Sequence, residues 1–217
     1  PRGVMVQDTA WDGYEEIPSW IMQGYGTMAM EAGEQLKEYG CERPTHIFVQ
    51  AGVGSLAGAV VGYFSNLYAD NPPVFVVVEA EAAACLYKGA AAGDGQIRIV
   101  DGDMETIMAG LACGEPNTIS WDILKNHVKV FIAAPDWVAA TGMRMLGAPI
   151  KGDAPVTSGE SGAAPFGALA AVMSMDEYAD LRKDIGLDEN SRVLLFSTEG
   201  DTDPDRYKNI VWKGLDK

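Results

Sequence analysis

Short apolar runs alternate along the chain with longer segments in which apolar residues recur at every third or fourth position. A continuous run of β-branched and aromatic residues predicts a buried strand, whereas the three-to-four spacing predicts a helix with one buried face. The longest helical pattern starts at Ser19, and Gly40 is expected to end that helix. The apolar runs predict strands at residues 4–7, 45–50, 73–78, 128–133 and 192–196.

The alternation of these elements indicates the fold class. A helix predicted at 55–69 separates the second strand from the third, and each later strand lies beside a predicted helix. Such alternation is typical of an α/β protein with an open, mostly parallel twisted sheet and helices on both faces. Residues 1–217 contain no repeat, low-complexity tract or linker, so we expect a single unit.

The start of the chain is unusual for a complete domain. The sequence opens directly on the predicted strand at 4–7, without Met and without a preceding element. Ligand sites of open α/β sheets usually draw on both halves of the fold. We therefore expect residues 1–217 to be the C-terminal part of a longer enzyme.

A glycine turn, "AGVGS" at 51–55, follows the predicted strand at 45–50 and leads into a helix of small residues. We expect Ser55 to be the N-cap of that helix. A strand that passes through such a turn into a helix leaves free backbone N–H groups at the positive end of the helix dipole. This arrangement suits an anion such as a phosphate. A tight βα turn without a ligand is the alternative.

Composition and charge narrow the classes of partner. The 217 residues, 47% of them apolar, can bury a sizeable core, and 31 acidic against 16 basic residues give a net charge of −15. Nucleic acids and anionic membrane surfaces attract basic proteins, so we expect this chain to bind neither. A small-molecule ligand is favoured instead. Because no stretch suits a membrane span or a signal peptide, the cytoplasm is the expected location.

The three cysteines, Cys41, Cys85 and Cys113, lack the CxxC spacing of a metal site, and the sequence has only two histidines to accompany them. Buried free thiols are the default expectation for a cytosolic protein. A redox-sensitive pair of Cys85 and Cys113 is the alternative.

The acidic segment near the C-terminus has the opening spacing of an EF-hand calcium loop, at Asp201, Asp203 and Asp205. Arg206 stands where such a loop requires glycine, and Trp212 stands where it requires a bidentate glutamate. We therefore expect no metal site and predict that these acids cap the last helix.

The glycine turn also fits a dinucleotide-binding fingerprint. Residues 52–57 match the GxGxxG/A pattern, and Glu79 ends the next predicted strand, where an acid could bind a ribose hydroxyl. Glu79 follows Gly52 at more than the roughly 20 residues usual for this role. An NAD(P)-binding Rossmann domain therefore stays open as an alternative.

Five segments resemble one family of enzymes. They are "QDTAWDGYEEIPSWIMQGYGTMA", "VQAGVGSLAGAVVGYF", "GDMETIMAGLACGEPN", "TSGESGAAPFGALAAV" and "VLLFSTEGDTD". Together they are similar to the diaminopropionate ammonia-lyases, a family of pyridoxal-phosphate enzymes with the tryptophan-synthase β-chain fold, also called fold type II. The similarity extends over essentially all 217 residues, and "GLACGEPN" and "STEGDTD" look particular to this family.

The resemblance implies pyridoxal 5'-phosphate as the cofactor. Backbone N–H groups of the glycine turn would hold its phosphate, and the Ser55 hydroxyl would be a further donor. Ser197, after the last predicted strand, would place its hydroxyl against the pyridine nitrogen, with Thr198 as the second choice. A neutral partner leaves this nitrogen unprotonated, which favours β-elimination. The implied cofactor-binding residues are Gly52, Val53, Gly54, Ser55, Leu56, Glu160, Ser197 and Thr198.

Several of these residues also have an ordinary structural interpretation. Asp8 resembles the family's pocket aspartate, which suits the ammonium group of a doubly aminated substrate; otherwise it forms an Asx turn. Glu160 begins a helix that faces the cofactor in relatives; otherwise it is an acid stabilised by the helix dipole. The hydroxyls of Ser197 and Thr198 could likewise only cap the following turn.

The resemblance also implies that part of the site is elsewhere. In this family the lysine that binds the cofactor as a Schiff base lies ahead of the glycine turn, together with an aspartate that serves as a base. Before Thr45 the only lysine is Lys37, whose surroundings do not match, and Lys88 and Lys151 resemble surface charges. We therefore expect residues 1–217 to be mostly the large cofactor-binding domain, without the Schiff-base lysine of the N-terminal half, and inactive alone.

The implied reaction converts 2,3-diaminopropionate to pyruvate and two ammonia by α,β-elimination, in an enzyme whose relatives form homodimers. A serine or threonine dehydratase of the same fold is the nearest alternative. A non-catalytic partner subunit is another.

Overall fold

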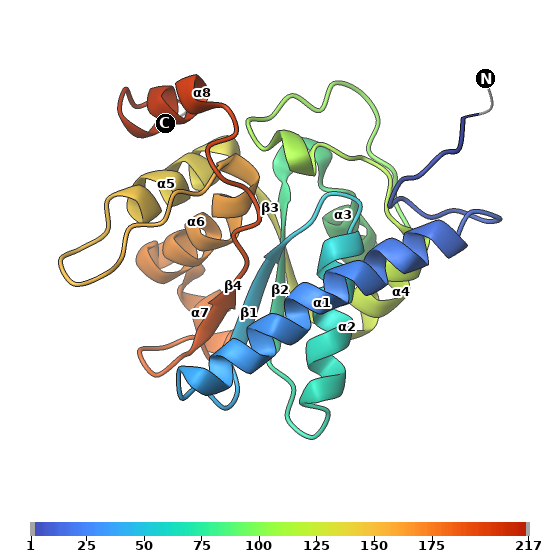
Figure 1. The fold of residues 1–217 in the computed structure, drawn as a ribbon, viewed down its shortest axis with the longest axis horizontal. Coiled ribbons are helices and arrows are strands. Elements are labelled where there is room, and N and C mark those ends of the chain that lie inside the picture. The colour runs from blue at the N-terminus through green and yellow to red at the C-terminus, as the bar shows by residue number, and fades with distance from the viewer. Residues whose placement is uncertain (1–2, 216–217) are drawn as a thin grey trace.

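A four-stranded parallel sheet lies at the centre of the molecule (Figure 1). The computed structural model describes residues 3–215. Within them the strands follow the order β3-β2-β1-β4, and every neighbouring pair is parallel. The strand bounds are β1 (His46–Gln50), β2 (Val74–Ala80), β3 (Val128–Ala134) and β4 (Val193–Leu195).

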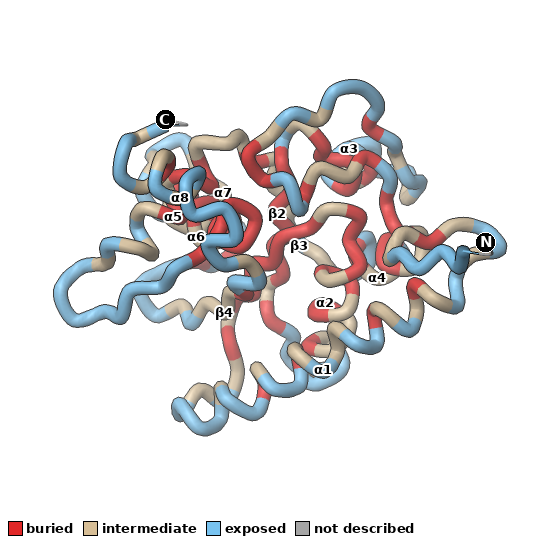
Figure 2. The backbone as a smooth tube through the Cα atoms, turned by 45° about the horizontal axis from the view of Figure 1, so that its top comes forward, coloured by how far each residue is buried: buried red, intermediate tan, exposed pale blue. Residues whose placement is uncertain are grey.

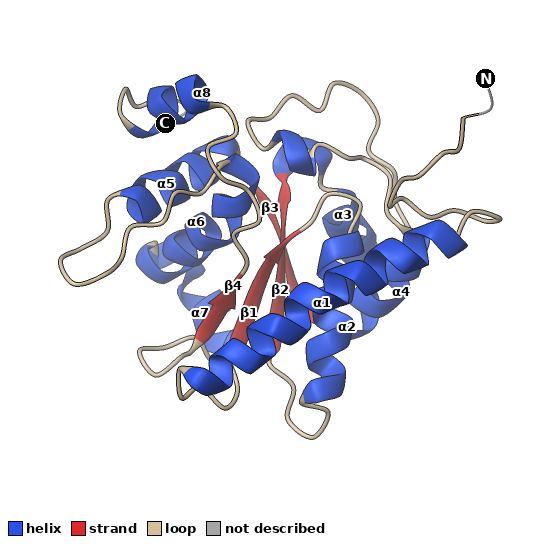
Figure 3. Cartoon of the chain, in the orientation of Figure 1, coloured by secondary structure: helices blue, strands red, loops and turns tan. Residues whose placement is uncertain are grey.

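Helices surround this sheet in the part of the chain that the structure describes (Figure 3). Single 3-10 turns at Glu81–Ala83, Ala109–Leu111 and Asp176–Tyr178 connect some of them. The helix bounds are α1 (Glu16–Glu38), α2 (Ser55–Leu67), α3 (Cys85–Ala92), α4 (Thr118–His127), α5 (Asp136–Gly147), α6 (Glu160–Ser174), α7 (Ala179–Ile185) and α8 (Pro204–Val211).

Alternating side chains of the strands fill two hydrophobic cores, one on each face of the sheet. Ile47 and Val77 pack on one face with residues of α1, α2, α3 and α4. Phe48 and Val76 pack on the other face with residues of α5, α6, α7 and α8. Figure 2 shows buried backbone in the sheet and in the helix segments that face it. The predicted α/β class, an open parallel sheet with helices on both faces, is therefore confirmed.

Four of the five predicted strands are confirmed, each to within two residues at either end. The strand predicted at 4–7 is wrong. Val4 is 83% exposed, and the backbone N–H of Gln7 donates to the Tyr14 hydroxyl instead of a neighbouring strand. An apolar run forms a strand only where its backbone pairs with another strand, and residues 4–7 pair with no strand among the described residues.

Within residues 3–215, no helix combines the length and the apolar character needed to cross a membrane.

Helices α5 and α6 pack so closely that backbone meets backbone. A Cβ atom added at Gly167 of α6 would overlap the carbonyl oxygen of Val138 in α5. Only glycine allows this approach, because any side chain would force the two helices apart. Since α6 also begins at the functional cavity described below, its packing against α5 fixes one wall of that cavity.

We predict that Gly167→Ala destabilises the protein by about 2 kcal/mol or more, because the new methyl group has no space beside Val138. Gly62→Ala in α2 is the matched control. The added methyl there would lie 3.7 Å from Ile123, an ordinary contact, and replacing glycine within a helix gains up to about 1 kcal/mol. Urea denaturation of the three proteins tests this, and equal midpoints for both variants would contradict the packing argument.

Candidate functional site

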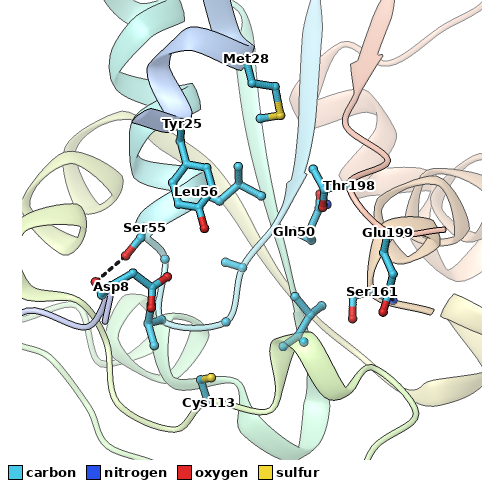
Figure 4. Close-up of a pocket in the computed structure, with 16 residues that line it drawn as sticks. Asp8, Tyr25, Met28, Gln50, Ser55, Leu56, Cys113, Ser161, Thr198 and Glu199 are labelled. Carbon is cyan, nitrogen blue, oxygen red and sulfur yellow. Dashed lines mark hydrogen bonds between the residues drawn. The ribbon is translucent and has the colours of Figure 1, made fainter. Parts of the chain in front are cut away.

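A cavity of about 460 Å³ opens at the carboxyl ends of β1 and β4, where open α/β sheets bind ligands (Figure 4). One end carries Asp8, Tyr25 and Ser55, and the other carries Ser161, Thr198 and Glu199. Between them lie the glycine turn and the loop around the Ala109–Leu111 turn. The full lining is Asp8, Tyr25, Met28, Gln50, Ala51, Gly52, Val53, Gly54, Ser55, Leu56, Gly110, Leu111, Cys113, Ser161, Thr198 and Glu199.

The glycine turn presents unpaired backbone donors to this cavity. Gly54 has a φ of 100°, in the left-handed region that favours glycine, and is the N-cap of α2. Among the hydrogen bonds of the described residues, none is donated by a backbone N–H of residues 52–57. Free N–H groups at a helix N-terminus bind anions. The predicted anion-binding geometry is therefore present, although Ser55 is the first helical residue and its prediction as N-cap was wrong.

The Ser55 hydroxyl has two partners within the protein. It donates to the backbone carbonyl of Asp8 at 2.8 Å, and it accepts from Asn117 Nδ2 at 2.8 Å. Ser55 does not cap α2 because Gly54 holds the N-cap position, and the Ser55 oxygen accepts from Asn117 instead of from a backbone N–H of the helix. A role of this hydroxyl in phosphate binding stays a prediction, whereas the Ser55 backbone N–H has no partner within the described chain.

A second helix N-terminus, that of α6, also faces the cavity but already holds a carboxylate. Glu199 Oε2 accepts from the backbone N–H of Ser161 at 2.6 Å and from that of Gly162 at 3.4 Å. This carboxylate occupies the position that an external anion would take. Of the two helix ends, the α2 end is therefore the one with free capacity for a phosphate.

Asp8 gives the opposite end of the cavity a negative charge. Burial raises the pKa of the Tyr25 phenol, and the nearby Asp8 charge raises it further. Burial and the Asp8 charge likewise raise the pKa of the Cys113 thiol. Since two groups of the lining lie within the field of this carboxylate, the cavity has a place suited to a cationic group.

The two predicted hydroxyls after β4 differ in position. Ser197 does not line the cavity, and its hydroxyl donates to Ser158 Oγ at 2.8 Å. Thr198 lines the cavity, and its Oγ1 accepts from Gln50 Nε2 at 2.9 Å. The structure thus places Thr198, the second choice for the ring nitrogen, at the cavity, while the hydroxyl of Ser197, the first choice, is paired with Ser158.

Glu160 begins α6, as predicted, but does not line the cavity. Its carboxylate forms an ion pair with Arg206 Nε at 3.1 Å. Burial raises the pKa of the Glu160 carboxyl, and the charges of Glu199 and Asp203 add to this rise while Arg206 opposes it. Its predicted role beside a cofactor stays untested.

The sequence interpretation missed four polar residues of the cavity wall. Gln50 ends a buried strand, and Glu199 follows the two predicted hydroxyls, so their positions at strand ends could have signalled a site. Tyr25 on α1 and Ser161 on α6 gave no such signal, because helical spacing alone assigns them to buried faces.

No lysine within residues 3–215 lines the cavity. Lys37, Lys88 and Lys151 are exposed, as are the other lysines in the described part of the chain. This agrees with the expectation that these lysines are surface charges.

Glu79, the acid of the dinucleotide alternative, has another function in this fold. Its side chain is 1% exposed, and its two oxygens accept from the backbone N–H groups of Leu86 at 2.8 Å and Tyr87 at 2.6 Å. It therefore holds the first turn of α3 and is not available to a ribose. Burial raises the pKa of the Glu79 carboxyl to about 7.

Cys41, Cys85 and Cys113 are free thiols. Cys85 Sγ lies 3.5 Å from the backbone carbonyl oxygen of Cys113, and burial raises the pKa of the Cys85 thiol to about 12. The described residues contain no cluster of three or more His, Cys, Asp or Glu that could hold a metal. Asp203 accepts from the backbone N–H of Arg206 and caps α8, which confirms the predicted capping role for this one acid of the segment.

Comparison with known proteins identifies the family of this fold and cavity. The family model described as pyridoxal-phosphate dependent enzyme matches residues 8–199. The chain belongs to this family of pyridoxal-phosphate dependent enzymes. The matched range runs from Asp8 to Glu199, the two acids at opposite ends of the cavity.

Within this family, the chain is similar to diaminopropionate ammonia-lyases. It is 56% identical over 212 residues to the lyase of Salmonella typhimurium, covering 97% of this chain and 52% of that protein. A crystal structure of the Escherichia coli lyase, in complex with an aminoacrylate-PLP azomethine reaction intermediate, has a TM-score of 0.88 and 48% identity, covering 97% of this chain and 52% of that chain. The chain therefore spans about half the length of these relatives.

More distant structures share the fold alone. The processed form of threonine deaminase isoform 2 from Solanum lycopersicum has a TM-score of 0.67 and 16% identity, covering 88% of this chain and 48% of that chain. The four-stranded parallel sheet with its helices thus matches fold type II, as the sequence predicts.

The cavity fits pyridoxal phosphate, the cofactor of this family. The free N–H groups of residues 52–57 suit its phosphate, and a Cβ on Gly52 would come within 3.3 Å of the Gly110 carbonyl oxygen, so the turn has the narrow shape of a cradle. Two buried polar atoms of the lining, Gln50 Oε1 and Ser161 Oγ, have no partner in the described structure. A volume of about 460 Å³ lies within the usual range of cofactor sites.

We predict that Glu79 makes the stability of the protein fall between about pH 4.5 and pH 7. Because its folded pKa of about 7 exceeds the 4.5 of an ordinary glutamate, the folded state keeps a proton that the unfolded state has released in this window. Stability is then full below the window and lower above it. Glu79→Gln should lack this fall, and should unfold about 1–3 kcal/mol more easily because its NH₂ faces a backbone N–H donor.

Urea denaturation at several values of pH tests this prediction. Glu81→Gln, which changes an exposed acid two residues away, should keep the pH dependence of the unchanged protein. Parallel curves for Glu79→Gln and the unchanged protein would mean that Glu79 does not titrate in this range.

Proposed function

We propose that residues 1–217 are the C-terminal, cofactor-binding part of a diaminopropionate ammonia-lyase. The 56% identity to the Salmonella typhimurium lyase over 97% of this chain carries the proposal. The complete enzyme converts 2,3-diaminopropionate to pyruvate and two ammonia by α,β-elimination. In this proposal the chain is a single unit, mostly the large domain, and the lysine that anchors the cofactor belongs to the N-terminal half.

The glycine turn binds the cofactor phosphate in this proposal. Its backbone N–H groups at the α2 N-terminus are the available donors, while the α6 N-terminus is occupied by Glu199. The residues that hold the phosphate are Gly52, Val53, Gly54, Ser55 and Leu56. A hydroxyl from Ser197 or Thr198 forms a hydrogen bond with the ring nitrogen of the cofactor. Glu160 lies outside the cavity lining, so in this proposal it affects the cofactor site indirectly, through its ion pair with Arg206.

Asp8 binds the second ammonium group of the substrate. The support is its place in the cavity lining and its charge, which raises the pKa of both Tyr25 and Cys113. When bound, pyridoxal phosphate withdraws electrons from the α-carbon of an amino acid. The chain's own contribution is then to hold the β-ammonium group of the substrate, the group that leaves, in a fixed orientation relative to the α-carbon.

The proposal extends to the cellular setting. The substrate is a small amino acid and the role lies in amino-acid catabolism. We propose a cytoplasmic homodimer for the complete enzyme, with neither nucleic acid nor membrane as a partner. The net charge of −15 supports the last point.

A serine or threonine dehydratase is the second candidate. The likeness to the Solanum lycopersicum threonine deaminase supports only the fold, because the identity is 16%. The side chain of serine or threonine carries a hydroxyl and no second ammonium group, so the Asp8 carboxylate would have no cationic side-chain partner there. Asp8 therefore favours the diamine. The involvement of Glu79 in α3 argues against the dinucleotide alternative.

The direct test measures pyruvate from DL-2,3-diaminopropionate in the presence of pyridoxal phosphate. The chain alone is compared with the chain co-expressed with the N-terminal half of the Salmonella typhimurium lyase. We expect pyruvate only from the complemented sample, because no lysine lines the cavity within residues 3–215. Pyruvate from the chain alone would contradict the proposed division of the site, and equal turnover of serine would favour the dehydratase.

We predict that Asp8→Asn raises KM for diaminopropionate about tenfold or more in the complemented enzyme, because it removes a charge-assisted contact with the substrate ammonium. The KM for serine should change little. Asp12→Asn is the control, since Asp12 is exposed and carries the same charge a short distance along the chain. Equal effects of the two variants would show that Asp8 acts only through the general field of the protein.

A further inference from the structure

The side-chain amide of Gln50 connects the ends of β1 and β4 beneath the cavity. Gln50 is 2% exposed. Its Nε2 donates to the backbone carbonyl of Phe196 and to Thr198 Oγ1, both at 2.9 Å. Its Oε1 is buried without a partner in the described structure.

The Phe196 carbonyl fixes the orientation of this amide. A carbonyl oxygen can only accept, so the NH₂ group must face it. The reversed amide would bring two carbonyl oxygens together, lose this hydrogen bond and leave the NH₂ unpaired. The orientation with Nε2 toward Phe196 and Thr198 is therefore the stable one.

This orientation determines what the Thr198 hydroxyl can do. The NH₂ group of Gln50 has no accepting lone pair, so Thr198 Oγ1 must accept from it and must donate its own proton elsewhere. No acceptor for that proton is found among the described residues, whereas the Ser197 hydroxyl donates to Ser158. Thr198 lines the cavity, so its proton is available to an acceptor on a bound ligand.

We propose that Gln50 is a positioning residue that makes Thr198, and not Ser197, the hydrogen-bond donor to the unprotonated ring nitrogen of pyridoxal phosphate. This inference rests on the proposed function and deepens it. Before any ligand binds, Thr198 already accepts from Gln50 and keeps a proton without an acceptor in the described chain, which favours the donor role. A protonated ring nitrogen would take the second lone pair of Thr198 Oγ1 and leave that proton unpaired.

The test compares the binding of pyridoxal 5'-phosphate with that of its 1-deaza analogue, in which a carbon replaces the ring nitrogen. Fluorescence titration of the chain gives a Kd for each probe. We expect the unchanged chain to prefer pyridoxal phosphate about three- to tenfold, the range of one neutral hydrogen bond. Thr198→Val and Gln50→Glu should bring this ratio to about one, because the first removes the donor and the second accepts its proton.

Three further variants and one further probe complete the test. Thr198→Ser should restore the preference, and Ser197→Ala should leave it unchanged. Inorganic phosphate should bind all variants with the same Kd, which shows that the glycine turn is intact. If Gln50→Glu loses phosphate binding through misfolding, Gln50→Met decides the role of the amide, with an expected fall in the ratio.

The outcomes separate this inference from the function on which it rests. If the unchanged chain binds pyridoxal phosphate but Thr198→Val keeps its preference, or Ser197→Ala loses it, the assignment of Thr198 is overturned and the proposed function stands. If both Gln50 variants fold and keep the preference, the positioning role is overturned. If the unchanged chain binds neither pyridoxal phosphate nor inorganic phosphate, the proposed cofactor site is overturned as well.

Discussion

The buried amide of Asn117 is the interaction on which the arrangement of the cavity depends. Its Nδ2 donates to the Asp8 carbonyl and the Ser55 hydroxyl, while its Oδ1 accepts from two backbone N–H groups in the first turn of α4. Asn117 is completely buried, so each lost partner would cost about 1–3 kcal/mol. One side chain thereby fixes the opening segment, the glycine turn and α4 relative to one another. Asp8 reaches the cavity through this tether, without a strand beside it.

The electrostatics of the cavity follow from the parallel sheet. Helix α2 directly follows β1, which places its N-terminus at the carboxyl edge of the sheet, and the N-terminus of α6, which follows α5, also lies at the cavity. Glu199 neutralises the α6 end, and the α2 end keeps its free N–H groups. No lysine or arginine lines the cavity within the described residues, so an anion there is held by neutral backbone dipoles. Backbone dipoles act only at short range, so they can bind a phosphate in the cavity although the chain as a whole carries a net charge of −15.

The sequence predicted the features that depend on local information. The strand at 45–50 and the glycine turn were predicted because a continuous apolar run and the adjacent glycines are both visible in a short stretch of sequence. The strand at 4–7 was wrong because pairing is decided by distant segments, and within the described residues no strand pairs with this segment. The capping role of Ser55 was wrong because Gly54 is the N-cap, and the donor to the Ser55 oxygen is Asn117, which lies 62 positions away. Gln50 was missed for the same reason, since its contact with Thr198 spans 148 positions.

The groups that line the cavity are suited to binding and orienting a ligand. The described residues supply free N–H donors at the turn, a hydroxyl at Thr198 that accepts from Gln50, and a carboxylate at Asp8, whose backbone carbonyl accepts from Asn117. These groups bind and orient. Removal of an α-proton needs a base beside the reacting carbon, and the exposed lysines of the described chain lie away from the cavity. The lining within residues 3–215 thus provides binding contacts and no lysine that could act as this base.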